Sequence, residues 1–174
     1  MIIAEQKRKE NIAEYLLYMY QVEDMIRANG LDLDRIDQTL ISRFDVAYDV
    51  KRDMREWYKS LIGMMKDEGK EETGHLEILE HITGKLHGLH HRLLEEGIDV
   101  SYKETHQRAR GNIEALRMRS GRNTENDVQV AMNGLYGLLL LKLQKSPVTP
   151  ETEKAFESIR EWVAELSARY MDTH

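Results

Sequence analysis

Cysteine is absent from this sequence of 174 residues, and proline occurs only twice. Without cysteine the chain has no disulfide, no thiolate nucleophile and no zinc site built from thiolates. Scarce proline and abundant Leu, Met, Glu, Lys and Arg favour helix over strand. The most apolar run, residues 135–143, contains Gly137 and Lys142 and is shorter than the ~18 apolar residues that span a bilayer. We therefore expect an all-α protein with no membrane span.

Positive charge is also in short supply, since 25 basic residues face 31 acidic ones. Proteins that bind DNA usually carry a basic surplus on at least one face, so DNA is not an expected partner. The N-terminal segment is charged from Glu5 onward and lacks the apolar centre of a secretion signal. Together with the absence of cysteine, this predicts a cytoplasmic location.

Apolar residues recur at the helical spacing of three or four along most of the chain. This periodicity and its flanking turn residues predict helices at residues 5–28, 33–40, 47–64, 71–96, 101–119, 124–143 and 150–170. A break near residues 42–45 is favoured over one helix through residues 33–68. The connections are short, and no repeat or linker divides the chain. The predicted fold is a single-domain antiparallel helical bundle of six or seven helices over residues 1–174.

The same periodicity predicts the core. The first helix carries a stripe of Ile12, Tyr15, Met19, Val22 and Ile26. The next two long helices are expected to bury Ala47, Val50, Met54, Trp57, Leu61 and Met64, and then Ile78, Leu79, Ile82, Leu86, Leu89 and Leu93. Residues 128–143 are apolar in nearly every direction, which predicts burial on all sides, in the core or against another chain.

Two local patterns refine this picture. Ser101 and Glu104 have the spacing of a capping box, so a helix is expected to begin there. Glycine inside a helix costs ~1 kcal/mol relative to alanine, and close helix contact usually offsets that cost. The glycines for which we expect such contact are Gly84, Gly88, Gly134 and Gly137.

Glu23 is an acidic residue at the rim of the apolar stripe of the first helix. Arg27 follows one helical turn later, and a glutamate on the N-terminal side of an arginine at this spacing forms a favourable local pair. We therefore predict a structural ion pair between Glu23 and Arg27. The alternative is a partly desolvated carboxylate that meets an arginine of another helix.

Histidine is concentrated in one region, since six of the seven fall between His75 and His106. His87, His91 and Glu95 are each four residues apart, so they share one side of a helix, and neutral imidazoles at this spacing can bind one divalent metal. That side faces away from the apolar stripe of its helix, so the simpler interpretation is a solvated row and a protein without a cofactor. The alternative is a zinc, nickel or iron site in a metal-dependent helical hydrolase or transferase.

Basic residues are concentrated in the helix that ends near Arg122. Arg108, Arg110, Arg117 and Arg119 could bind an anionic ligand or RNA. No aromatic residue is interleaved after Tyr102, so bases have no obvious stacking platform. A solvated outer helix with salt bridges is the simpler interpretation of the segment Arg108–Arg122.

The opening residues, MIIAEQKRKENIAEYLLYMYQVEDMIRA, resemble the N-terminus of an uncharacterised bacterial family, a helical domain of unknown function of about this length. The resemblance is strongest over residues 1–28. It implies an all-helical bacterial protein and brings no catalytic motif.

No Gly-x-Ser-x-Gly, Walker or dinucleotide-binding motif marks an active site in the sequence. The apolar surplus on the first helix and on residues 128–143 favours association. We therefore expect a non-catalytic protein that acts through protein–protein contact, with itself as a homo-oligomer or with another protein. The metal-dependent enzyme and the anion- or RNA-binding helix are the alternatives.

Overall fold

The chain is all-helical in the computed structural model, which describes residues 2–97, 99–121 and 125–173. These ranges hold eight α-helices and one short 3-10 helix, where the sequence predicted six or seven helices. In order they are α1 (Ile2–Glu10), α2 (Ile12–Ala28), α3 (Leu33–Thr39), η1 (Ile41–Arg43), α4 (Tyr48–Asp67), α5 (Glu77–Glu96), α6 (Val100–Ser120), α7 (Asp127–Leu143) and α8 (Pro150–Thr173).

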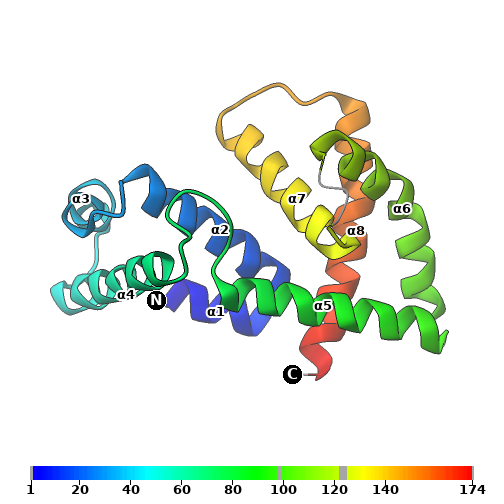
Figure 1. Cartoon of the computed structure of the whole chain (residues 1–174), viewed down its shortest axis with the longest axis horizontal. Helices are drawn as coiled ribbons and strands as arrows, with labels where there is room; N and C mark the ends of the chain where they lie inside the picture. Colours follow the sequence, from blue (N-terminus) through cyan, green and yellow to red (C-terminus); the bar gives the residue numbers. More distant parts are fainter. Residues whose placement is uncertain (1, 98, 122–124, 174) are drawn as a thin grey trace.

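The helices fall into two groups that α2 and α5 connect. Figure 1 shows α3 and α4 at one end of the molecule and α6, α7 and α8 at the other. α2 packs against α1, α7 and α8, and α5 packs against α6, α7 and α8. One apolar core runs through both groups, and its largest fully buried side chains include Trp162, Tyr58 and Tyr102. None of the helices in the described ranges is long and apolar enough to cross a membrane.

The first predicted helix is two helices, because the chain breaks at Asn11. The backbone of Asn11 is extended (φ −156°, ψ 108°), and its side chain accepts the N–H groups of Ala13 and Glu14 at 3.0 and 3.1 Å. Ser167 of α8 donates to the same oxygen at 2.9 Å. Asparagine is a preferred N-cap, and a partner from a distant helix holds it in that role. The predicted stripe from Ile12 to Ile26 is buried as expected.

α5 begins at Glu77, six residues later than predicted. The preceding loop is held by α2: Arg27 donates to the carbonyl oxygens of Lys70 and Gly74, and Glu23 accepts the N–H of Leu76. These contacts satisfy the backbone of the loop in place of helical hydrogen bonds. Most of the predicted core face of α5 is buried, whereas Ile78 is 42% exposed.

The break between α3 and α4 is confirmed, since η1 ends at Arg43 and α4 begins at Tyr48. The buried face of α4 is displaced from the predicted seam. Met54 and Leu61 are buried as predicted, but the other buried positions are Tyr58, Ile62 and Met65. The N-terminal half of the seam lies at the end of the molecule where few helices cover it (Figure 1).

Three further helix ends and faces differ from expectation. Asp99, and not Ser101, caps α6, because its side chain accepts the N–H of Tyr102 at 2.9 Å. Asn126 caps α7, and residue 124, where this helix was predicted to begin, lies outside the described residues. α7 is not covered on all sides, since Leu141 and Leu143 near its C-terminus are exposed.

Candidate metal centre

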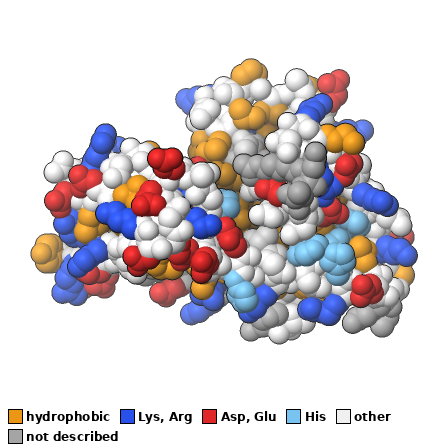
Figure 2. Space-filling model, in the orientation of Figure 1, with side chains coloured by type: hydrophobic (Ala, Val, Ile, Leu, Met, Phe, Trp, Pro, Cys, Tyr) orange, Lys and Arg blue, Asp and Glu red, His pale blue; other side chains and the backbone are white. Residues whose placement is uncertain are grey.

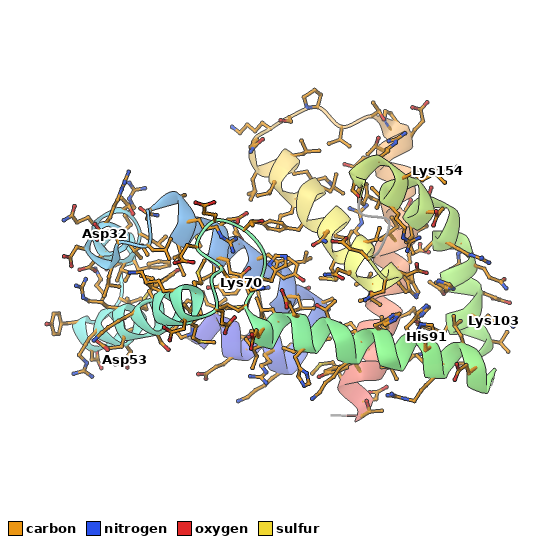
Figure 3. The ribbon with its side chains drawn as sticks, viewed as in Figure 1. Asp32, Asp53, Lys70, His91, Lys103 and Lys154 are labelled. Atoms are coloured by element: carbon orange, nitrogen blue, oxygen red, sulfur yellow. The ribbon has the colours of Figure 1, made fainter. Side chains whose placement is uncertain are left out.

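Four histidines and one aspartate meet where α5, α6 and the start of α7 come together. α5 supplies His87, His90 and His91, α6 supplies His106, and Asp127 is the first residue of α7. All five line one cavity of about 450 Å³. Figure 2 shows histidine side chains gathered on this face, and Figure 3 shows His91 on α5 near Lys103 on α6.

The centre of this group is the set His90, His106 and Asp127. Each offers one ligand atom, and these atoms all lie within 4.8 Å of one another. His90 and His106 are buried, at 3% and 8% exposed. The Nε2 atom of His106 lies 3.3 Å from a carboxylate oxygen of Asp127. Ligands that surround zinc tetrahedrally at ~2.0–2.2 Å are about 3.4 Å apart, so small side-chain movements would close this set around an ion.

The protonation states of the group suit metal binding. Burial, and after it the charge of His106, lowers the pKa of His90 to about 4. Burial and the neighbouring His91 also lower the pKa of His87. The hydrogen bond with His106, followed by that from Arg117, holds the pKa of Asp127 below its usual range. At neutral pH His87 and His90 are therefore neutral and Asp127 is ionised, which are the forms that bind metals.

A buried hydrogen-bonded chain fixes the ring of His90. Nδ1 of His90 lies 2.7 Å from the hydroxyl of Tyr102, and Nε1 of Trp162 donates to that hydroxyl at 3.0 Å. Tyr102 and Trp162 are fully buried. Because Nδ1 is engaged by Tyr102, Nε2 is the nitrogen available to a ligand. Metal-binding histidines commonly have their second nitrogen held in this way.

His87 carries the one buried side-chain polar atom in the described ranges that lacks a hydrogen-bond partner, its Nδ1. Its ring meets that of His91 edge to face, with centroids 4.4 Å apart. Buried polar atoms are normally paired, so this nitrogen is placed to meet a group bound in the cavity.

The predicted set His87, His91 and Glu95 is only partly brought together. His87 and His91 line the cavity together with residues of α6, and His91 is partly open to solvent, whereas Glu95 is exposed and lies outside the lining. The partners that complete the group are His90 on the same helix, His106 and Asp127. Helical spacing alone does not mark His90 and Asp127 as partners, because their proximity depends on the packing of three helices.

The four arginines of the predicted basic site do not share one face. Arg108 pairs with Glu161 of α8 at 3.4 Å, whereas Arg117 turns toward α7 and pairs with Asp127 and with Glu114 of its own helix. Arg119 is exposed, and Arg122 lies outside the described residues. Arg110 and Lys103 line the histidine cavity, and neither has an ion-pair partner among the described residues.

The structure gives Glu23 and Arg27 partners other than each other. Glu23 is 1% exposed and lies 2.6 Å from Nδ1 of His75, while Arg27 pairs with Asp24 at 3.0 Å. The predicted ion pair between them is therefore replaced by two separate pairs. Glu23 points toward the loop before α5, where an imidazole and a free backbone N–H are available to it.

The fold and the cavity define an all-helical protein with a histidine–aspartate centre between three of its helices. The chain belongs to a family described as a domain of unknown function (DUF4924), whose model matches residues 1–174. The suggested family membership is thus confirmed over the whole chain. No curated protein and no solved structure matches it.

Proposed function

We propose that this protein binds one divalent transition-metal ion through His90, His106 and Asp127. The observation that carries the proposal is the convergence of three ligand atoms within 4.8 Å beside an orphaned His87 nitrogen. Two imidazoles and a carboxylate suit zinc, nickel or iron. Three protein ligands leave a coordination position open, as in catalytic zinc sites.

The cavity around the ion favours a small anionic substrate. Lys103 and Arg110 line it without ion-pair partners in the described ranges. A bound metal would supply a water molecule acidic enough to form hydroxide near neutral pH. We therefore propose metal-assisted hydrolysis of a small ester that carries a phosphate or carboxylate group. His87 would take one proton from the attacking water and return it to the leaving oxygen, as the water oxygen bonds to the ester carbon or phosphorus and the bond to the leaving oxygen breaks.

A competition titration with a chromophoric zinc chelator tests metal binding on protein purified without an affinity tag. The wild type is expected to bind one zinc ion, and His106→Asn and Asp127→Asn are expected to weaken binding by about 100-fold or more, since even supporting residues contribute 10- to 100-fold. His81→Asn is the matched control, because His81 is an exposed histidine of α5 outside the cavity.

Circular dichroism is the check that each variant is folded. A wild type that leaves all zinc on the chelator, or ligand variants that bind as tightly as His81→Asn, would remove the proposal. Hydrolysis is read separately, from zinc-dependent release of p-nitrophenol from its phosphate ester, with the neutral acetate ester as the comparison that lacks an anionic group.

Association with another copy of the chain is a second proposed function. Leu141 and Leu143, near the C-terminal end of α7, are 42% and 56% exposed. They lie on different sides of the last turn of α7, so two large apolar side chains at the end of this helix are open to contact with another protein. A second copy would offer the same pair of leucines in return, as two-fold symmetry requires.

A further inference from the structure

A larger cavity, of about 680 Å³, lies between α2, the loop before α5, the end of α6 and α7. It shares no lining residue with the histidine cavity. Its walls combine polar groups with apolar surface from Leu116, Val130, Gly134 and Gly137. A cavity of this size can hold a small molecule.

A carboxylate–imidazole pair lies at the wall of this cavity. The two oxygens of Glu23 are both used: one accepts the N–H of Leu76 at 2.8 Å, and the other lies 2.6 Å from Nδ1 of His75. An ionised carboxylate can only accept, so Nδ1 carries the proton. In the neutral ring Nε2 then has a free lone pair. His75 lines the cavity and its side chain is 23% exposed, while Glu23 behind it is buried.

The ring of His75 is held in this orientation from two sides. It stacks on Tyr20, with ring centroids 3.6 Å apart and planes 17° from parallel. Arg27 donates to the carbonyl oxygens of Lys70 and Gly74, which fixes the loop that carries the histidine. An imidazole with one nitrogen on a buried carboxylate and a fixed ring is a common arrangement for a proton acceptor.

The charge of the lining selects for a cation. Four carboxylates line the cavity, from Asp24, Glu72, Glu80 and Glu125, and Glu80 among them pairs with Lys70 at 2.8 Å. The one arginine in the lining, Arg27, is committed to Asp24 and to the loop carbonyls. The hydroxyl of Tyr136 donates to Asp24 at 2.7 Å. Glu72 is exposed and has no ion-pair partner in the described part of the chain. Anions are therefore repelled here, and a positively charged group is attracted.

We propose that this cavity binds a small molecule with a primary amine and a short apolar chain. The ammonium group lies among the carboxylates and against Nε2 of His75, and the chain lies on the apolar surface of α6 and α7. Nε2 of His75 accepts a hydrogen bond from the ammonium group, and Glu23 holds Nδ1 on the other side of the ring.

The test is an NMR titration of the protein labelled with ¹⁵N-histidine, using butylamine hydrochloride as the probe and sodium butyrate as its anionic counterpart, both at pH 7. Butylamine is expected to shift the Nε2 resonance of His75 in a saturable manner, and butyrate is not. Gly137→Phe should weaken butylamine binding by about tenfold or more, which corresponds to the loss of at least one apolar contact. A Cβ at this position meets no atom within 4 Å, so the phenylalanine side chain would occupy space in the cavity.

Gly84→Phe is the matched control, since its Cβ also meets nothing within 4 Å and the residue lies on α5 outside the lining. Glu72→Gln is a second variant that leaves the core untouched. It should weaken butylamine binding by about threefold, because one partly exposed charge contact is lost. The proposal fails if butylamine causes no saturable shift of the His75 resonance, or if butyrate binds as tightly as butylamine. It also fails if neither Gly137→Phe nor Glu72→Gln weakens butylamine binding relative to Gly84→Phe.

Discussion

Asp99 joins two helices through a single carboxylate. One oxygen accepts the N–H of Tyr102 at the start of α6, and both oxygens pair with Arg169 of α8. The hydrogen bond from Arg169, and after it that from Tyr102, lowers the pKa of Asp99. A carboxyl group whose pKa is lower in the folded state than in the unfolded chain stabilises the folded state. This contribution is fully present at pH values above the pKa of the unfolded chain, and it is lost as the pH falls through the pKa of the folded state.

Asp99→Asn tests this contribution, because asparagine keeps a capping oxygen and removes the charge. At pH 7 we expect the variant to lose about 1 kcal/mol of unfolding free energy, a value limited by solvent screening. The difference from wild type should shrink below about pH 4, where the unfolded carboxyl becomes protonated. Urea unfolding at pH 7, 5, 4 and 3 measures the difference in unfolding free energy between wild type and variant. Asp53→Asn, at an exposed aspartate of α4, is the control; a difference that grows toward low pH would contradict the account.

Glu23 shows what the sequence can and cannot reveal about a single residue. Its position at the rim of the stripe of α2 was visible from helical spacing, and so was the need for a partner. The partner was not, because His75 and the N–H of Leu76 lie 52 and 53 positions away and reach Glu23 only through the folded loop. Arg27 was the nearest candidate partner in sequence, whereas in the structure Glu23 pairs with His75 and the N–H of Leu76.

At the scale of the element, helical spacing predicted most of the helices and tertiary contacts decided their ends. The stripe of α2, the start of α8 at Pro150 and the break before α4 followed from the sequence. The break at Asn11 depends on Ser167 of α8, and the late start of α5 depends on Arg27. These partners are distant in sequence, so no local pattern signals them.

The helical glycines give a prediction at the same scale. Of the four expected to mark close contact, only Gly134 does so: an added Cβ would lie 2.7 Å from a methyl of Leu116 and 3.3 Å from Phe156. Gly84 has open space at its Cβ position. Gly84→Ala should therefore stabilise the protein by about 1 kcal/mol through helix propensity. Gly134→Ala should not stabilise the protein, because the close contact of the new Cβ with Leu116 offsets the gain from helix propensity. Urea unfolding compares the two, and an equal gain in both would contradict the packing described for α7.

At the scale of the whole molecule, the two cavities exist only because separate helices meet. The row His87, His91 was visible in the sequence, since both lie on one helix. His106 and Asp127 join them from α6 and α7, and no spacing rule relates residues on three helices. Glu95, the third member of the predicted row, is exposed and lies outside the lining of the cavity. A periodic pattern thus located the region of the candidate metal centre without the full set of proposed ligands.

Self-association is also a property of the whole molecule. If α7 contacts a second copy through Leu141 and Leu143, light scattering should give the mass of a dimer for the wild type. Leu143→Lys should shift the mass toward the monomer, because a buried lysine charge in the contact is unfavourable. Lys145→Glu, at an exposed position just beyond α7, is the control for a change of surface charge. A wild type that is monomeric at all concentrations would leave the exposed leucines without this role.

The most direct test of metal binding is X-ray diffraction from crystals grown with zinc, recorded on both sides of the zinc absorption edge. The account predicts an anomalous peak between α5, α6 and α7, at ~2.0–2.2 Å from a nitrogen of His90, a nitrogen of His106 and an oxygen of Asp127. A zinc-containing crystal with no peak at these three side chains, or with its peak on exposed histidines alone, would contradict it.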